Sequence, residues 1–163
     1  MAQVIIALGS NLGDRIGHLS RAKQFLSTLA NGQLRFSSVF ETEPVGEAST
    51  QTYLNAVCCF DTSLDALSLL EALKSYEQEH GRDLNAPRWA NRTIDLDIID
   101  YNRAIINRQR LQVPHPDYHK RLFVLIPLKE LLPGWNEITT GEPIDALITR
   151  AEEIEILKTV AKW

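Results

Sequence analysis

The chain has 163 residues, of which 44% are hydrophobic and 23% charged, and it carries a net charge of -4 with a pI near 5.6. This length fits a single domain over residues 1–163, and the acidic balance argues against a general nucleic-acid or membrane-surface binder. No apolar run is long enough for a transmembrane helix, and the first residues do not read as a signal peptide. We therefore expect a cytoplasmic protein, and a monomer because there is no obvious apolar excess.

Hydrophobic periodicity predicts alternating strands and helices in the first hundred residues. The expected strands cover residues 3–10, 53–62 and 92–101, and residues 33–45 are expected to be a strand that runs into a loop at Pro44 and Gly46. A helix should begin at Asp14 and end at Asn31-Gly32, and a second helix, capped by Ser63, should end before Gly81. The order of these elements is β-α-β-β-α-β, which is typical of a ferredoxin-like α+β fold with an antiparallel sheet and helices packed on it.

The last third of the sequence predicts additions to this pattern. One helix is expected around residues 121–132, broken or shifted by Pro127. Another is expected around 143–154, and a short final strand around 154–161.

The cysteines of the chain are Cys58 and Cys59. Because successive side chains of a strand point to opposite faces, these neighbours cannot form a disulfide framework. The sequence therefore predicts two free thiols packed in the core.

The segment RTIDLDII, residues 92–99, carries two acidic side chains in a run of strand formers. Alternation places Asp95 and Asp97 on one face, with Cα atoms roughly 7 Å apart. Two such carboxylates could hold magnesium ions that also bind substrate phosphates. A solvated strand face with two ordinary aspartates is the simpler interpretation of this motif taken alone.

Arginines on both sides of this strand favour the phosphate interpretation. Arg82, Arg88 and Arg92 lie in the polar segment before it, with Trp89 among them, and Arg110, His115 and Arg121 follow it. Arginine neutralises phosphate oxygens with a planar, bidentate fork. A set of unrelated surface arginines is the competing explanation. The long segment over 81–92 could also close over a bound nucleotide, or be a connection without a role.

An aromatic residue and an amide suggest a second ligand. Tyr53 and Asn55 share one face of their strand, and a ring beside an amide suits a flat heterocycle. Phe123 could supply the opposite wall, although both rings could equally be core residues. The motif GSNLGD at 9–14 resembles a phosphate turn only loosely, and the chain has no P-loop motif.

Four blocks in this order resemble the 6-hydroxymethyl-7,8-dihydropterin pyrophosphokinase family. They are GSNLGD, ETEPVG followed by YLNA, RWANRTIDLDI, and VPHPDYHKRLFVLIPL, and the resemblance extends from Gly9 to about Leu132. It implies a reaction of folate biosynthesis in which ATP gives its β,γ-pyrophosphoryl group to the pterin hydroxymethyl group and AMP leaves. It also implies a ferredoxin-like α+β fold.

The resemblance implies a role for each matching residue. Two Mg²⁺ ions would be held by Asp95 and Asp97, and ATP would be the co-substrate. The matching catalytic residues are Arg82, Arg92 and Asp97. The nucleotide and its phosphates would be bound by Glu77, Trp89, Arg110, His115 and Arg121. The pterin would be bound by Thr42, Val45, Tyr53, Asn55, Asp95 and Phe123.

This sequence departs from the family pattern at several positions. Ala90-Asn91 stands where a glycine-proline pair is frequent, and Leu84 where some members carry an arginine; Pro116 stands where an aromatic residue is frequent. We expect these differences to affect the closure of the loop more than the metal site. They leave open a catalytically weakened pterin- or nucleotide-binding paralogue, and a different magnesium-dependent nucleotide enzyme on the same fold.

Overall fold

The computed structural model describes residues 1–44, 51–81, 85, 91–151 and 156–161. Its elements in chain order are β1 (Ala2–Ser10), α1 (Arg15–Leu29), β2 (Arg35–Phe36), β3 (Val39–Thr42), β4 (Tyr53–Thr62), α2 (Ala66–Glu79), β5 (Asp95–Tyr101), β6 (Ile106–Arg108), β7 (Leu111–Val113), a short 3-10 helix (Tyr118–Lys120), α3 (Leu122–Leu131), α4 (Ile144–Arg150) and β8 (Ile156–Ala161).

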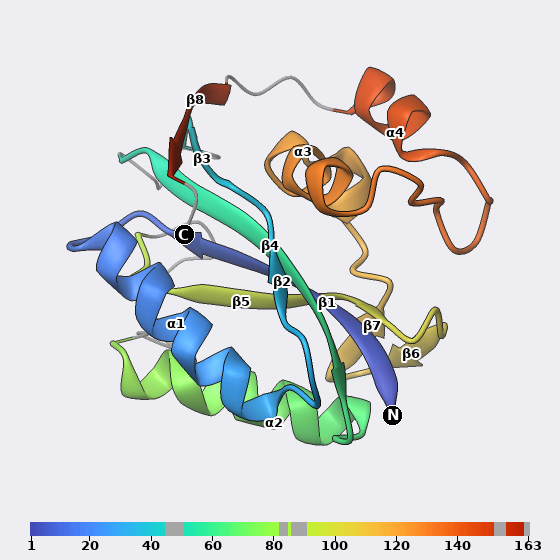
Figure 1. Ribbon diagram of the computed structural model, residues 1–163, viewed down its shortest axis with the longest axis horizontal. Helices are drawn as coiled ribbons and strands as arrows, with labels where there is room; N and C mark the ends of the chain where they lie inside the picture. Colours follow the sequence, from blue (N-terminus) through green and yellow to red (C-terminus); the bar gives the residue numbers. More distant parts are fainter. Residues whose placement is uncertain (45–50, 82–84, 86–90, 152–155, 162–163) are drawn as a thin grey trace.

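The main sheet is antiparallel in every pairing, with the strand order β5-β1-β4-β3-β8 and with β2 also paired to β4 (Figure 1). The predicted α+β class with an antiparallel sheet is therefore confirmed. The central strands β1 and β4 pair over nine residues, from Ala2 opposite Thr62 to Ser10 opposite Leu54.

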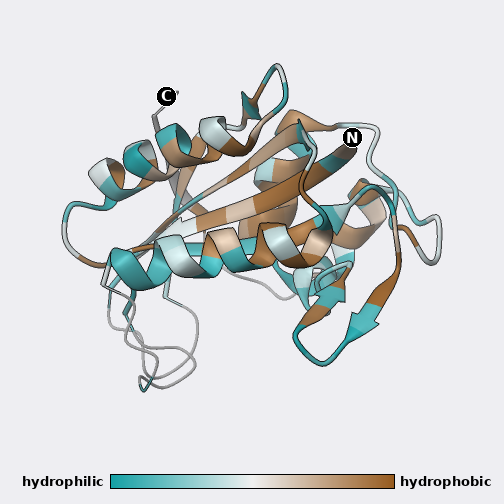
Figure 2. Cartoon of the chain, turned by 90° about the horizontal axis from the view of Figure 1, so that it is seen from below, coloured by the Kyte–Doolittle hydropathy of each residue, from teal (hydrophilic) through white to brown (hydrophobic). Residues whose placement is uncertain are grey.

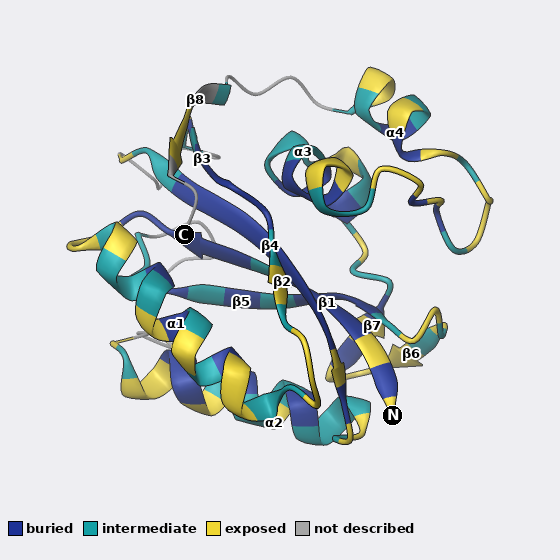
Figure 3. Ribbon diagram, in the orientation of Figure 1, coloured by how far each residue is buried: buried dark blue, intermediate teal, exposed yellow. Residues whose placement is uncertain are grey.

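Helices cover both faces of the sheet and create two hydrophobic cores. The first core packs α1 and α2 against side chains such as Ile6 and Leu96, and the second packs α3 and α4 against side chains such as Ile5 and Ile99. Figure 2 shows the strands between the helices as mainly hydrophobic, whereas the helices mix hydrophilic and hydrophobic residues. In Figure 3 the buried residues accordingly concentrate on β1, β4 and β5.

Cys58 and Cys59 follow this division, as the sequence predicts. Both thiols are free and buried, and Cys58 belongs to the first core while Cys59 belongs to the second. Burial raises the pKa of both thiols, so that they stay protonated.

Several sequence predictions of local structure were wrong. The strand predicted from residue 33 is divided into β2 and β3, and between them Ser38 donates to the Glu130 carboxylate on α3 through both its N–H and its hydroxyl, each at 2.8 Å. The helix α2 is capped by Asp65 rather than Ser63, since the Asp65 carboxylate accepts hydrogen bonds from two backbone N–H groups. The helix α3 continues through Pro127.

The hairpin formed by β6 and β7 was not predicted. No described helix has the length and apolar character needed to cross a bilayer.

Candidate active site

The floor of the candidate site is made by side chains that lie opposite one another on three neighbouring strands. Asp95 on β5 pairs with Gly9 on β1, and Gly9 pairs with Asn55 on β4. The next row places Asp97 opposite Ala7. Because β1 has the small residues Gly9 and Ala7 opposite Asp95 and Asp97, the two carboxylates and the amide share an open surface.

The alternation of β5 agrees with the sequence prediction. Ile94, Leu96 and Ile98 belong to the core under α1 and α2, whereas Asp95 and Asp97 line a pocket on the opposite side of the sheet. This pocket has a volume of about 270 Å³, close to the small end of the range for ligand sites.

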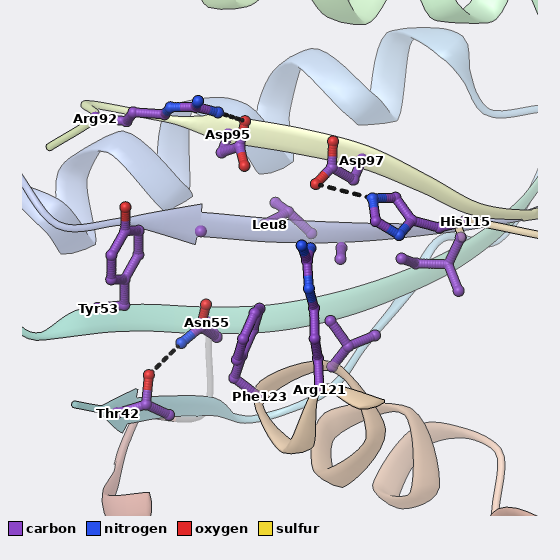
Figure 4. A pocket seen from close by; sticks show the side chains of 14 residues that line it. Leu8, Thr42, Tyr53, Asn55, Arg92, Asp95, Asp97, His115, Arg121 and Phe123 are labelled. Carbon is purple, nitrogen blue, oxygen red and sulfur yellow. Dashed lines mark hydrogen bonds and ion pairs between the residues drawn. The ribbon is translucent and has the colours of Figure 1, made fainter. Parts of the chain in front are cut away.

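The walls of the pocket come from β3, β4, the loop after β7 and the start of α3. Figure 4 shows the side chains that converge there. The lining residues are Ala7, Leu8, Gly9, Thr42, Tyr53, Asn55, Arg92, Asp95, Asp97, Ile99, His115, Arg121, Phe123 and Val124.

Arg92 is held beside the first carboxylate by a buried asparagine. Its guanidinium donates to Asp95 at 2.8 Å. Its backbone N–H donates to Asn11 Oδ1 at 2.6 Å, and the Asn11 N–H donates to the Arg92 carbonyl at 3.1 Å. Asn11 is 0% exposed and also donates from Nδ2 to Asn91 Oδ1 at 2.9 Å. The GSNLGD motif thus supplies an anchor for Arg92, a role that sequence reasoning missed.

Asp97 lies in an environment that disfavours its charge. Burial, followed by repulsion from Asp95, raises the pKa of the Asp97 carboxyl. Lys74, His115 and Arg121 oppose this rise. Lys74 Nζ lies 3.7 Å from Asp97 Oδ1, and His115 Nε2 lies 3.9 Å from Asp97 Oδ2. A cation bound between the carboxylates would relieve their repulsion.

The tautomer of His115 follows from its hydrogen bonds. Nδ1 accepts the Asp117 backbone N–H at 3.1 Å, so in the neutral ring the proton belongs on Nε2, the atom that faces Asp97. Burial lowers the pKa of His115, and the attraction of Asp97 offsets this only in part. The ring therefore presents an N–H donor to the pocket at neutral pH.

The other end of the pocket is aromatic and amide-rich. Tyr53 and Phe123 lie on either side of Asn55 in Figure 4. Asn55 is 5% exposed, and its Nδ2 donates to Thr42 Oγ1 at 2.8 Å, which fixes the plane of the amide. The Arg121 guanidinium lies 5.6 Å from the centre of the Phe123 ring. A flat, hydrogen-bonding ring would suit this end.

Two predicted site residues lie away from the pocket lining. Glu77 is 0% exposed and accepts the Leu96 N–H at 2.6 Å and the Lys74 ammonium at 3.0 Å. Arg110 is exposed and pairs with Glu71 at 3.4 Å. Lys74 was not predicted from the sequence, because only the packing of α2 along the edge of β5 brings it to Asp97.

Comparison with known proteins places these residues in a family. The sequence profile of the 7,8-dihydro-6-hydroxymethylpterin-pyrophosphokinase (HPPK) family matches residues 5–133. This chain belongs to the HPPK family.

Named HPPK relatives are similar over most of their length. A 2-amino-4-hydroxy-6-hydroxymethyldihydropteridine pyrophosphokinase from Bacillus subtilis is 44% identical over 141 residues, which are 86% of this chain and 84% of that protein. The enzyme of the same name from Haemophilus influenzae is 42% identical over 132 residues, 80% of this chain and 82% of that protein.

Solved HPPK-DHPS structures share the fold. The Plasmodium falciparum HPPK-DHPS with SDX-DHP superposes with a TM-score of 0.70 at 14% identity. The match covers 91% of this chain but only 44% of that one, so this chain spans less than half of the solved protein.

Some residues implied by the HPPK resemblance fall outside the described part of the structure. They are Val45, Arg82 and Trp89, and the departures Leu84 and Ala90 also lie outside the described residues. The other departures, Asn91 and Pro116, are described, and the Asn91 side chain accepts the hydrogen bond from Asn11.

The carboxylate pair fits a magnesium site of the kind the HPPK resemblance implies. No group of three or more potential protein ligands occurs among the described residues. Magnesium typically takes one or two carboxylates and completes its shell with water and substrate phosphates. Burial and the repulsion from Asp95 both raise the pKa of Asp97, and a bound cation would stabilise its charged form.

Proposed function

We propose that this chain transfers pyrophosphate from ATP to the hydroxymethyl group of 6-hydroxymethyl-7,8-dihydropterin, a step of folate biosynthesis. The observation that carries the proposal is the meeting of a carboxylate pair with an aromatic and amide wall in one cavity, in a member of the HPPK family. The 42–44% identity to enzymes named for this activity supports it.

The transfer forms one bond and breaks one. The pterin hydroxyl oxygen attacks the β-phosphorus of ATP, and the bond from that phosphorus to the oxygen bridging it to the α-phosphorus breaks. AMP leaves with the bridging oxygen, and the hydroxyl proton is released. ATP and the pterin are therefore the substrates, and the products are AMP and the pterin diphosphate.

The carboxylates would hold the metal. Asp95 and Asp97 would bind two Mg²⁺ ions together with the phosphates of ATP, and bound magnesium lowers both the phosphate charge and the pKa of a coordinated hydroxyl. The neutral Nε2–H of His115 and the guanidinium of Arg121 would bind phosphate oxygens. Arg92, already paired with Asp95, would stabilise the negative charge that develops on the leaving group.

The pterin would lie at the aromatic end of the pocket. Tyr53 and Phe123 would stack on its faces, and the fixed amide of Asn55, supported by Thr42, would bind its hydrogen-bonding edge. Pterin analogues that lack the matching hydrogen-bonding groups should bind weakly, because they leave the Asn55 amide without its partner. We propose that the chain acts as a monomer.

Phosphorus NMR tests the proposal directly. Purified protein, ATP, Mg²⁺ and 6-hydroxymethyl-7,8-dihydropterin should yield AMP and a pterin diphosphate in equal amounts. ADP as product would instead mean transfer of a single phosphoryl group. Binding of the pterin without turnover would identify the weakened paralogue, which the close similarity to named enzymes does not favour.

A further inference from the structure

An arginine on α1 is bonded to the segments that carry the pterin end of the pocket. Arg15 Nη1 donates to the Thr52 carbonyl at 2.9 Å and to Thr52 Oγ1 at 2.7 Å. Arg15 Nη2 donates to Glu41 Oε1 at 3.0 Å, and Thr52 Oγ1 donates to the same oxygen at 2.8 Å. We call Arg15, Glu41 and Thr52 the Arg15 clamp.

The clamp lies directly behind two residues of the pocket. Glu41 precedes Thr42 on β3, and Thr52 precedes Tyr53 at the start of β4. Thr42 and Tyr53 are register partners and both line the pocket. Because side chains alternate along a strand, the clamp holds the two backbones from the α1 side while their neighbours face the ligand.

The chemistry of the clamp makes it directional rather than a loose surface ion pair. The side chains of Arg15 and Glu41 are 29% and 12% exposed, so solvent screens them only in part. One planar guanidinium reaches a carbonyl, a hydroxyl and a carboxylate at once, which a lysine ammonium on a flexible stem does not reproduce.

We propose that Arg15 is a positioning residue for the pterin, acting through Glu41 and Thr52 to fix where Thr42 and Tyr53 stand. The inference rests on the proposed function, because it takes the pterin as the ligand of this end of the pocket. Thr42 in turn accepts a hydrogen bond from the Asn55 amide. The effect of the clamp therefore extends to the amide that would bind the hydrogen-bonding edge of the pterin.

The test compares two arginines of the same helix. Arg21 also forms an ion pair, with Asp14 at 3.8 Å, but both side chains are largely exposed and neither lines the pocket. Calorimetric titration of native protein, Arg15→Ala, Arg15→Lys and Arg21→Ala should be run separately with the pterin and with the magnesium complex of α,β-methylene-ATP. Melting temperatures should be recorded for each.

We expect Arg15→Ala to weaken pterin binding about tenfold, the order of coupling seen between residues of one hydrogen-bond network. Its nucleotide affinity should stay within about twofold of native, and Arg21→Ala should match native protein for both ligands. Arg15→Lys keeps the charge and protects the fold, yet should recover only part of the pterin affinity. Because Arg15 and Glu41 act together, the loss in Arg15→Ala/Glu41→Ala should be smaller than the two single losses combined.

Three results would overturn the inference. Native pterin affinity in Arg15→Ala would remove the positioning role. Equal losses of pterin and nucleotide affinity, following a lowered melting temperature, would make the clamp a general support of the fold. Failure of native protein to bind the pterin would contradict the proposed function and the role of the clamp together. This outcome is measured on native protein, whereas the other two are measured on the variants, so the two kinds of failure can be distinguished.

Discussion

Asp97 is a carboxylate in a place that disfavours its own charge. Burial and the neighbouring Asp95 raise its pKa, although cationic side chains lie close by. A group whose pKa is higher in the folded than in the unfolded state stabilises the fold when protonated and costs stability when ionised at neutral pH. The ionised Asp97 carboxylate therefore destabilises the native state at the position where a metal ligand is proposed.

Asp97→Asn should separate activity from stability. We expect turnover to fall about a thousandfold, the equivalent of several kcal/mol of lost charge stabilisation. Without magnesium at pH 7, the melting temperature should equal or exceed that of native protein. This advantage should disappear below about pH 3.9, the ordinary pKa of an unfolded aspartate, where native Asp97 is protonated in both states. Asp61→Asn, on an exposed position of β4, is the control.

Gly9 sets the shape of the floor between the carboxylates and the amide. A Cβ at this position would lie 3.3 Å from Asn55 Oδ1 and 3.7 Å from the Tyr53 ring. The hydrogen bond to Thr42 keeps the Asn55 amide from moving aside freely.

Gly9→Ala should therefore weaken pterin binding about tenfold, a typical cost of crowding a packed site. Gly134→Ala is the matched control, because a Cβ there meets nothing within 4 Å. Titration of both variants with the pterin measures the difference. Unchanged affinity in Gly9→Ala would show that the pterin does not rely on the present place of the Asn55 amide.

At the scale of elements, β5 is an edge strand whose outer side is completed by the side chains of α2. The Leu96 N–H donates to Glu77, and the Leu96 carbonyl accepts from Lys74 at 3.2 Å. The side chains of Glu77 and Lys74 thus satisfy backbone groups that a neighbouring strand would otherwise bind. Their backbone partner, Leu96, lies between the two aspartates of the site. The helix thus holds the strand that carries the carboxylates.

Glu77→Ala should destabilise the protein by about 2–3 kcal/mol, because it leaves the buried Leu96 N–H without its acceptor. Glu79→Ala, on the same helix but exposed, should have almost no effect. Urea unfolding measures both. Should Glu77→Ala instead keep native stability and lose nucleotide affinity, Glu77 would act as the nucleotide contact that the family resemblance implies.

The sequence predicted those elements that have strong local signals. The alternation of β5 and the shared face of Tyr53 and Asn55 followed from side-chain period alone. The β6–β7 hairpin was missed because Gln109 and Arg110, between its strands, are not the glycine or asparagine that mark a tight turn.

Contacts between distant segments could not be predicted in this way. Asn11 bonds to Arg92, 81 residues away, and Lys74 reaches Asp97 only because α2 packs along the edge of β5. Neither Asn11 nor Lys74 belongs to a local sequence pattern that indicates its distant partner. These two contacts of the site could therefore be found only from the folded structure. The same holds for Glu77, whose burial and hydrogen bond to the Leu96 backbone N–H could not be predicted from the sequence.

At the scale of the whole molecule, the pocket joins the sheet to the helical layer of α3. Its lining comes from β1, β3, β4 and β5 on one side and from Phe123 and Val124 of α3 on the other. A ligand that fills it therefore contacts elements brought together from residue 7 to residue 124.

Bound substrates should consequently stabilise the entire fold. The pterin at about 100 times its dissociation constant should add about 2.7 kcal/mol, which corresponds to a rise of about 5–10 °C in melting temperature for a chain of this size. The magnesium complex of α,β-methylene-ATP should raise the melting temperature further. Its α–β bridge is a methylene group that the reaction cannot cleave. Scanning calorimetry measures the shift, and an unchanged transition at saturating pterin would contradict the proposed binding site.

Cys58 and Cys59 give the protein two internal reporters one residue apart. Each thiol belongs to a different core, so each reacts with an alkylating reagent only when its own side of the sheet opens. Fragment-ion mass spectrometry of slowly labelled protein distinguishes single from double modification and assigns a single label to Cys58 or Cys59. Simultaneous labelling would mean that the molecule opens as one unit. Labelling of Cys59 first would mean that α3 and α4 separate from the sheet while the core under α1 and α2 stays closed. The ligand pocket would then open together with α3.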